Sequence, residues 1–507
     1  MARPYRALLA GALGLLAPVA CHGDPGGRVD GGGTGGDAGP GSGGSPATSS
    51  GGGTSAGSAS GGTSDAGETE DGAATDGAAS DAAPVISAEA RALLAALRYD
   101  PGPPPADPSN RFADDPGARA LGQAFFFETA LSGRLLETDN DGSAGTLGRA
   151  GEAGRVSCAG CHLPSGGFVD TRSPHQQISL AAQWGRRRAP TLLDAAFFPL
   201  YNWDGRRDSL WSQALGVIEN ASEFNSARLF VAEQIFKLYR SRYEAVFGAM
   251  PQLDDPSRFP QLGPLEAGCN AGPVETAACR GKPGDKADYD GMAADAQLDV
   301  TRVVVNTTKA MAAYVRQLRC GPSRFDQWLE GDTGVLSPSE QRGAALFVGA
   351  GKCVSCHSGP QLTDGKFHNV GLRPATVAVA FTDTGDRGAA EALPLLLTDP
   401  LNTRGAFSDG DRGVLPAAVG PALEGAFQTP TLRCIGSQPS FMHTAQGGTL
   451  DAVVGFFNRG GDPAGFPGTN EITPLGLSDG ERADLVAFIR ALQGAGPDAA
   501  LLTPPGN

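Results

Sequence analysis

Two short motifs constrain this chain more than any other feature of its sequence. Both read Cys-x-x-Cys-His, and their cysteines and histidines are Cys158, Cys161 and His162, and Cys353, Cys356 and His357. Two thiols on one helical turn can each add to a vinyl group of haem, and the histidine that follows then lies under the ring and binds the iron. A zinc site is the alternative, but it needs four ligands brought together. The spacing therefore predicts two covalently attached c-type haems.

The first 84 residues have the features of an exported, tethered protein. Arg3 and Arg6 precede an apolar run that is too short to span a bilayer and that ends at Cys21, in a sequence resembling a bacterial lipobox. Residues 1–20 are predicted to be a signal peptide with Cys21 as the lipidated first residue of the mature chain; a plain signal peptide is the alternative. Residues 21–84 are mostly small and polar, which predicts a disordered, flexible tether. We expect a periplasmic lipoprotein held at the outer membrane.

The charge of the chain limits its partners. The formal net charge is −15, whereas nucleic-acid binding needs a basic footprint. We therefore expect no nucleic-acid partner. The acidity is compatible with docking a basic electron-donor protein, and equally with ordinary solubility.

The body of the protein, from Val85 onward, is predicted to be mainly α-helical. Apolar residues recur at helical spacing, and residues suited to N-caps stand before several of these runs. We expect helices over residues 87–99, 115–128, 226–249 and 299–319, with further helices opening at Ser337 and Ser478. Strand signals are few and short.

A weak internal duplication divides the body. Each haem motif follows a helix rich in Leu and Phe and then a glycine-rich turn. We therefore predict two cytochrome c-like haem lobes, an N-terminal one over residues 85–325 and a C-terminal one over residues 326–507. Four further cysteines remain for disulfides. Cys269 could pair with Cys279 and Cys320 with Cys434, but four cysteines allow three connectivities.

An ordered string of landmarks accompanies the two motifs. It includes Arg188-Ala189-Pro190-Thr191, Trp203-Asp204-Gly205-Arg206, Phe367-His368-Asn369-Val370-Gly371, Phe427-Gln428-Thr429-Pro430-Thr431-Leu432-Arg433 and Phe441-Met442-His443. With these landmarks the chain from about residue 115 to 493 resembles the bacterial di-haem cytochrome c peroxidases and the related MauG-type di-haem oxidases.

The resemblance implies different tasks for the two haems. The N-terminal haem, on His162, would be the peroxide site, and the C-terminal haem, on His357, would pass electrons to it. The family's glutamine and glutamate at the peroxide site correspond to Gln213 and Glu223, which would move a proton between the peroxide oxygens. Polar residues on a helix surface are the alternative for both. Trp203 would relay electrons between the haems, or would simply pack in the core.

Phe457 departs from the family at the C-terminal haem. The family places a methionine or tyrosine there as the sixth iron ligand, and phenylalanine cannot bind iron. This haem is therefore either five-coordinate or bound by another residue, such as Met442 or His443. The loss of a thioether ligand should lower its potential.

Two further positions bear on metal ligation. Arg188 stands where the family has an asparagine that binds calcium between the lobes. A cation does not coordinate calcium, so calcium is disfavoured here and Arg188 could supply the positive charge itself. His175 follows the first motif in a loop. It is either a resting-state ligand of the peroxide-site iron or a solvated histidine.

Three functions are compatible with these features. The first is a peroxidase that reduces hydrogen peroxide to water with electrons from a small cytochrome or cupredoxin. The second is a MauG-like oxidase that modifies a protein side chain, and the third is an electron-transfer cytochrome without catalysis. A pure carrier needs no pocket that moves protons, so Gln213 and Glu223 favour an enzyme. Family members are often dimers, so a homodimer is an open expectation.

Overall fold

The computed structural model describes residues 84–172, 178–270, 278–374 and 385–506, which all belong to one compact unit. The predicted signal peptide, the lipidation site at Cys21 and the predicted tether before residue 84 lie outside the described residues. The described chain is rich in helices, as predicted, and no helix within it is long and apolar enough to cross a membrane.

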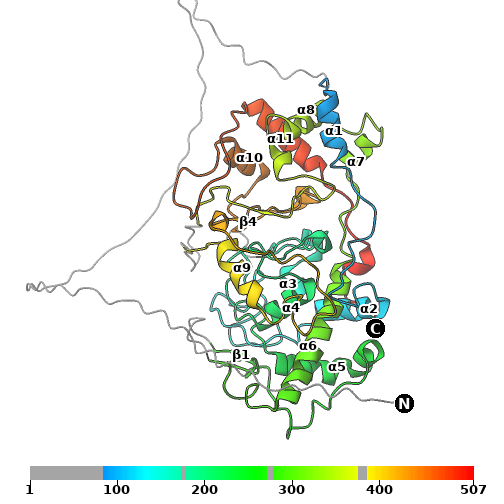
Figure 1. Cartoon of the computed structure of the whole chain (residues 1–507), viewed down its shortest axis with the longest axis vertical. Coiled ribbons are helices and arrows are strands. Elements are labelled where there is room, and N and C mark those ends of the chain that lie inside the picture. Colours follow the sequence, from blue (N-terminus) through cyan, green and yellow to red (C-terminus); the bar gives the residue numbers. More distant parts are fainter. Residues whose placement is uncertain (1–83, 173–177, 271–277, 375–384, 507) are drawn as a thin grey trace, which may run out of the picture. The chain divides into compact units, whose positions relative to one another are not determined.

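The secondary structure consists of helices and two short strand pairs. The helices are α1 (Ala88–Ala95), α2 (Pro116–Phe127), α3 (Cys158–Cys161), α4 (Leu210–Glu219), α5 (Arg228–Phe247), α6 (Ala294–Val315), α7 (Arg324–Leu329), α8 (Pro338–Val348), α9 (Ala389–Thr398), α10 (Leu450–Asn458) and α11 (Asp479–Ala491). The strands are β1 (Gly268–Cys269), antiparallel to β2 (Cys279–Arg280), and β3 (Phe367–His368), antiparallel to β4 (Phe427–Gln428). Figure 1 shows their order along the chain.

The predicted helix starts agree with the structure where a capping residue marks them. Ser337 and Ser478 both form full capping boxes with an acidic residue at the third helical position, at the start of α8 and α11. Helix α6 begins earlier than predicted, at Ala294, because its first turn is polar and gives no apolar periodicity.

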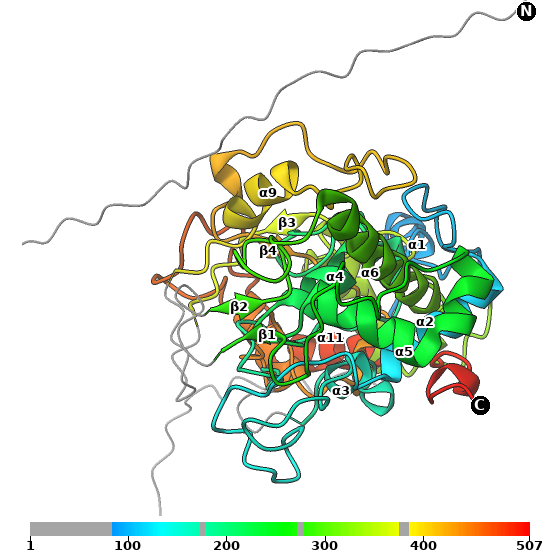
Figure 2. The same cartoon turned by 90° about the horizontal axis from the view of Figure 1, so that it is seen from below.

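The first hydrophobic core forms around α6. Helices α2, α4 and α5 pack against it, and Figure 2 shows α2 and α5 beside it. Gly122 of α2 allows the close approach, because a Cβ atom at this position would lie 1.8 Å from the carbonyl oxygen of Ala310 in α6. This glycine is therefore required by packing between the two helices.

The second hydrophobic core is built on α8 and α11, which lie side by side. Helix α10 packs on α11, and α1 packs on α8. Again a glycine sits at the contact: a Cβ atom on Gly343 would lie 2.0 Å from the carbonyl oxygen of Asp484. Two helix pairs, one in each core, thus use the same packing device.

Each end of the described chain packs in the core that is built mainly from the other half of the sequence. Leu94 and Leu97, in and just after α1, belong to the second core, although sequence order places them in the predicted N-terminal lobe. Residues 499–503 return to the first core, where the side chain of Gln123 donates to two of their carbonyl groups. No single cut in the sequence therefore separates the cores, and the division at residue 325 stays a prediction.

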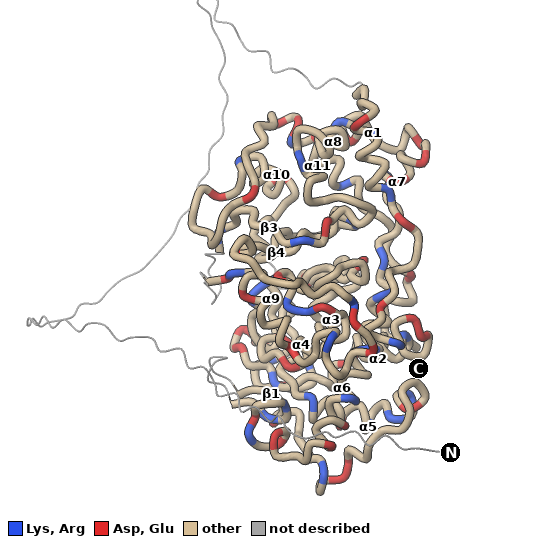
Figure 3. The backbone as a smooth tube through the Cα atoms, in the orientation of Figure 1, with Lys and Arg blue, Asp and Glu red and all other residues tan. Residues whose placement is uncertain are grey.

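Two disulfides join the four described cysteines that lie outside the haem motifs. They pair Cys269 with Cys279 and Cys320 with Cys434, which confirms one of the three connectivities left open by the sequence. The second bond closes a loop with a sequence separation of 114 residues, so it restrains the unfolded chain strongly. Acidic and basic residues are interspersed along the described chain (Figure 3), and many of them form ion pairs.

Candidate haem sites

The first motif forms a single helical turn, α3, as its proposed chemistry requires. The backbone N–H of His162 donates to the carbonyl of Cys158 at 2.8 Å, which closes the turn and brings the histidine below the two cysteines. The Nδ1 atom of His162 lies 3.0 Å from the carbonyl oxygen of Phe168. Burial lowers the pKa of His162, so the ring is neutral and its Nδ1–H donates to that carbonyl. Nε2 is left for iron.

The second motif repeats this geometry. The backbone N–H of His357 donates to the carbonyl of Cys353 at 2.8 Å, and its Nδ1 lies 3.0 Å from the carbonyl oxygen of Leu362. Burial lowers the pKa of His357 as well. A histidine that ligates a metal usually donates its other N–H to a carbonyl, which fixes the tautomer and the ring orientation. Both histidines therefore fit proximal ligation of a haem iron.

The two motifs lie in a structural repeat that extends well beyond them. We call residues 158–223 the first cradle and residues 353–458 the second cradle. The hydroxyl of Thr191 donates to the carbonyl of Gly167 at 2.7 Å, and the hydroxyl of Thr431 donates to the carbonyl of Gln361 at the same distance. A short 3-10 turn follows each threonine, and then a capped helix, α4 or α10. The weak duplication of the sequence is thus a repeated haem-binding structure.

The helices α4 and α10 correspond residue by residue. Ser209 caps α4 and Thr449 caps α10, each in the same extended conformation, and the first helical residue is a leucine in both. In this correspondence Gln213 of the first cradle matches Val453 of the second, and Val217 matches Phe457. The polar group predicted for catalysis therefore has an apolar counterpart in the second cradle.

One cavity, about 570 Å³, lies between the cradles and is lined by both proximal histidines. Trp203, His443 and Phe427 also line it, together with Cys353 and Cys356. The two proximal histidines in its lining and the four motif cysteines, none of which forms a disulfide, fit haem binding at both motifs. Trp203 lines this cavity with both proximal histidines, and its role as a relay between the haems stays a prediction.

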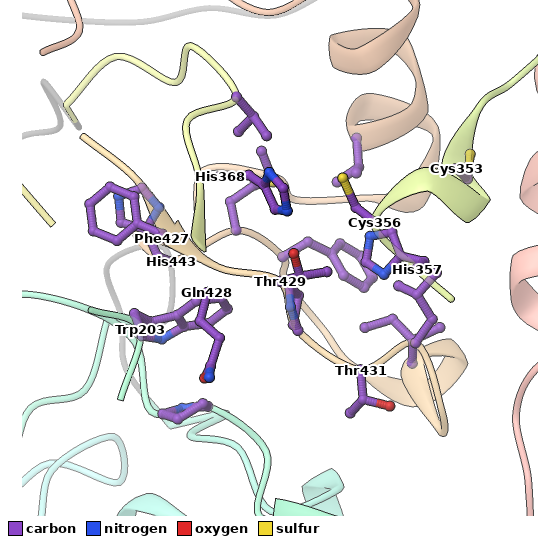
Figure 4. A pocket seen from close by; sticks show the side chains of 18 of the residues that line it. Trp203, Cys353, Cys356, His357, His368, Phe427, Gln428, Thr429, Thr431 and His443 are labelled. Carbon is purple, nitrogen blue, oxygen red and sulfur yellow. The ribbon is translucent and has the colours of Figure 1, made fainter. Parts of the chain in front are cut away.

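Trp203 and His443 pack together across the cavity wall. The indole N–H of Trp203 donates to the carbonyl of Arg188 at 2.9 Å. The ring of His443 stacks on Phe427, with centroids 3.6 Å apart, and its centroid lies 6.3 Å from that of Trp203. Figure 4 shows these three rings together. Burial lowers the pKa of His443 to about 3, so this imidazole is neutral.

The ligand candidates for the second haem line the same cavity. Phe457, in α10, lines it together with Met442 and His443. His368 also faces this cavity, but its two ring nitrogens lie 2.7 Å from Glu471 and 2.9 Å from a second carboxylate, that of Asp364. Both ring nitrogens of His368 are therefore engaged by carboxylates. Ligation of the second haem iron by Met442 or His443 stays a prediction.

A second, polar cavity of about 670 Å³ brings the predicted acid–base residues together. Gln213 and Glu223 both line it, and Asn202 and Gln213 line both cavities. The side-chain amide of Asn220 donates to Glu223 at 3.2 Å. Burial raises the pKa of Glu223 above the ordinary glutamate value, although the cation of Arg206 opposes this shift.

Glu223 lies on the side of the first haem motif. Burial raises the pKa of the Cys158 thiol to about 12, and the nearby charge of Glu223 adds to that shift. The carboxylate has the same effect on Cys161. The predicted acid–base residue and the predicted peroxide-site motif are thus close in space.

Two other sequence predictions concern metal ligands. Arg188 is buried and contacts Gln438 and Ser440, which belong to the second cradle. Within the described ranges there is no cluster of three or more histidine, cysteine or acidic side chains that could hold a metal ion. His175, the predicted loop ligand, lies outside the described residues.

Some residues of this region gave no signal in the sequence. Asn220 orients Glu223, yet a single asparagine is too common to single out. Phe427 belongs to a landmark of the sequence, but its stacking on His443 was not predicted. Arg187 bridges Asp204 and Asp386 at 2.6 Å each, joining segments far apart in the sequence. Only the fold brings these groups together.

Comparison with known proteins gives a consistent picture. The family model described as di-haem cytochrome c peroxidase matches residues 116–334. The methylamine utilization protein MauG of Methylorubrum extorquens is 30% identical over 379 residues, which cover 74% of this chain and 77% of MauG. The cytochrome-c peroxidase IdrP1 of Denitromonas iodatirespirans is 28% identical, with 74% and 80% of the two chains covered.

A solved structure has the same fold. The diheme peroxidase BthA of Burkholderia thailandensis E264 superposes with a TM-score of 0.54 and 22% identity, over 79% of this chain and 92% of BthA. The likeness supports the arrangement of the body around two haem sites.

Proposed function

The chain belongs to the di-haem cytochrome c peroxidase and MauG family and carries two covalently attached c-type haems, and on this basis we propose that it reduces hydrogen peroxide to water with electrons from a small redox protein. The reaction takes up two electrons and two protons and yields two water molecules. The observation that carries the proposal is the polar cavity that Gln213 and Glu223 both line, together with the place of Gln213 in the lining of the cavity that also contains His162.

The chain holds the haems through residues already described. Cys158 and Cys161 would bind the first haem covalently, with His162 under its iron, and the second motif would do the same in the second cradle. When bound, the haem supplies a redox-active iron that can bind and reduce peroxide. The buried, neutral imidazole of His162 is held in one orientation by the carbonyl of Phe168.

Glu223 is proposed to move the proton at the peroxide. Its raised pKa makes the carboxylate a better base than an exposed glutamate, and it readily returns the proton to the departing oxygen. The amide of Asn220 keeps the carboxylate oriented, and Gln213 would hold the peroxide by hydrogen bonding. The position of α10 that corresponds to Gln213 holds Val453, which cannot form such a hydrogen bond.

Electrons are proposed to enter at the second haem and to pass Trp203. The indole lines the cavity shared by both proximal histidines and is fixed by its hydrogen bond to the carbonyl of Arg188. The donor would be a small cytochrome or cupredoxin. We assign the enzyme to the periplasm, with residues 85–325 as the peroxide-reducing lobe and residues 326–507 as the electron-entry lobe.

The second haem is proposed to differ from a conventional electron-storage haem. Phe457 cannot ligate iron, so Met442 or His443 would be the residue that holds the iron together with His357, or His357 would hold it alone. Each of these residues lines the cavity.

A MauG-like oxidase is the second candidate. It is favoured by the 30% identity to MauG over most of both chains and by Trp203, which lines the same cavity as the two proximal histidines. In this function peroxide oxidises a side chain of another protein, and no small electron donor turns over. Gln213 and Glu223 would serve both enzymes, so they favour catalysis over simple electron transfer.

A peroxide assay distinguishes the candidates. The holoenzyme is mixed with hydrogen peroxide and a reduced small cytochrome, and the oxidation of the cytochrome is followed. Rapid turnover that depends on Glu223 supports the peroxidase. Peroxide consumption without donor turnover supports the oxidase, and absence of peroxide consumption refutes both.

A further inference from the structure

Arg188 is a buried cation without a carboxylate partner among the described residues. Its exposed fraction is 5%. The guanidinium donates to the carbonyl of Ser440 and, at 2.5 Å, to the side-chain oxygen of Gln438, which are both neutral. Its Nε atom is buried and has no hydrogen-bond partner. A buried charge normally needs a counter-charge, because its desolvation costs several kcal/mol.

The neighbouring arginine shows how this protein compensates a buried cation. Arg187 is buried to a similar degree, but its guanidinium contacts the carboxylates of Asp204 and Asp386 at 2.6 Å each. Burial lowers the pKa of Arg188 to about 10, whereas the two carboxylates hold the pKa of Arg187 above its ordinary value. Arg188 therefore lacks the anion that its neighbour has.

The second cradle has an uncharged residue at the position of Arg188, so the hydrogen bonds that hold the structure can be told apart from the effect of the charge. Gln428 is its counterpart in the second cradle. The backbone N–H of Arg188 donates to the carbonyl of His443 at 2.9 Å, and that of Gln428 donates to the carbonyl of Trp203 at 2.7 Å. His443 and Trp203 themselves correspond, so the two pairs are related by the repeat.

The side chains correspond in the same way. The guanidinium of Arg188 donates to the carbonyl of Ser440, and the amide of Gln428 donates to the carbonyl of Leu200 at 3.0 Å. Ser440 and Leu200 occupy matching positions before the two rings. A neutral amide is thus sufficient to donate a hydrogen bond to this carbonyl. The positive charge of Arg188 is therefore not explained by this hydrogen bond.

The missing anion can be located in the cavity that Arg188 lines. Arg188 lines it together with His162 and His357, the two proximal histidines. Each haem carries two propionate carboxylates, and an arginine fork matches a carboxylate in shape and charge. We propose that Arg188 pairs with a propionate of one of the two haems and, through its backbone, fixes Trp203 beside this ion pair. This proposal depends on the presence of the haems and not on the peroxidase activity. An experiment can therefore contradict the pairing of Arg188 without contradicting the proposed function, and the reverse.

The test is the reduction potential of each haem in the Arg188→Gln holoprotein. Gln428 indicates that glutamine fits this place, so the variant should fold and keep two haems per chain. Loss of a nearby cation disfavours the reduced haem. We expect the reduction equilibrium of the paired haem to fall about tenfold, or 59 mV for one electron, with a smaller change at the other haem. The haem that changes more identifies the source of the propionate.

Two controls make the result specific. Arg188→Lys keeps the charge and should recover most of the potential. Arg316→Gln removes another buried arginine, one paired with Asp114 outside both cavities, and should leave both potentials unchanged. A general loss of packing would not be rescued by lysine.

Resonance Raman spectroscopy gives a second measurement. The propionate bending band reports hydrogen bonding to the carboxylate, so it should shift in Arg188→Gln, shift less in Arg188→Lys and stay unchanged in Arg316→Gln. Unchanged potentials and an unchanged band in Arg188→Gln would overturn the proposal. A protein that carries fewer than two haems with either glutamine or lysine would also count against it, because Arg188 would then be needed for folding.

Discussion

The two cradles hold their proximal histidines in nearly the same way but surround them with different chemistry. His162 and His357 each donate to a backbone carbonyl 3.0 Å away. On the matching helices, Gln213 of α4 and Val453 of α10 occupy corresponding positions. The comparison teaches that a repeated scaffold can hold two proximal histidines alike while a few substitutions change the chemical groups around each of them.

The charged groups differ between the cradles as well. Arg188 and Gln428 occupy matching positions and donate to matching carbonyls, but of these two residues only Arg188 is charged. Glu223 adds a carboxylate of raised pKa on the side of the first motif. We propose on this basis that proton transfer takes place in the first cradle, since the corresponding helix of the second cradle presents apolar groups such as Phe457 and Val453.

The largest expected effect is that of removing the proposed base from the first cradle. Glu223→Gln should lower kcat for peroxide reduction by about 10²–10³-fold, because general acid–base catalysis is lost. Steady-state turnover with a reduced donor measures it. Glu128→Gln, a carboxylate outside both cavities that Tyr239 contacts, should change kcat little. Equal losses in both variants would contradict a specific role of Glu223.

The next prediction exchanges matching residues between the cradles. Gln213→Val gives the first cradle the residue of the second, and kcat/KM for peroxide should fall by about tenfold to a hundredfold, because a hydrogen-bond donor is lost. The reverse change, Val453→Gln, should not raise kcat/KM. If Gln213→Val keeps full activity, the asymmetry of the helices does not explain the location of the chemistry.

Ligation of the second haem is tested by restoring a thioether. Phe457→Met should convert the haem on His357 to a low-spin state with a higher potential, because methionine ligation favours reduction. Absorption and electron paramagnetic resonance spectra of the ferric protein report this change. Phe456→Met, at the buried neighbouring position, is the matched control. Identical spectra of both variants would show that position 457 does not reach the iron.

The pH profile should report Glu223 as a smaller effect. Its pKa is raised, and a base must be deprotonated in the free enzyme, so kcat/KM should fall as the pH decreases through this raised pKa. The acidic limb should therefore lie above the ordinary glutamate range and disappear in Glu223→Gln. An unchanged limb in that variant would assign the ionisation to another group.

Calcium removal is expected to have the smallest effect. Arg188 places a cation where the resemblance implied a calcium ligand, and it donates to Gln438 in the second cradle. Dialysis against a calcium chelator should leave the spectra and the turnover unchanged. A loss of activity that calcium restores would refute the view that the arginine supplies the charge.

Much of this comparison could be predicted from the sequence, because the relevant signals are local. The Cys-x-x-Cys-His spacing fixed both haem motifs, and Ser337 and Ser478 marked two helix starts. Helices α4 and α10 were not predicted, although the shorter helix α1 was. Their correspondence became visible only in the backbone, because Gln213 and Val453 share no chemistry.

Other features depend on contacts that sequence order does not reveal. Arg187 and Arg188 are adjacent and chemically identical, yet the first meets two carboxylates and the second none among the described residues. The packing of α1 on α8, which are separated by about half of the chain, likewise had no local signal. Tertiary context decides such cases.

The most direct test of the central claim is a single-turnover measurement. Prereduced holoprotein is mixed with hydrogen peroxide, and the second-order rate constant of peroxide consumption is compared in the wild type, Glu223→Gln and Phe457→Met. We predict a loss of about a hundredfold in Glu223→Gln and an unchanged rate constant in Phe457→Met. A normal rate in Glu223→Gln together with a large loss in Phe457→Met would place the peroxide chemistry in the second cradle and contradict the account.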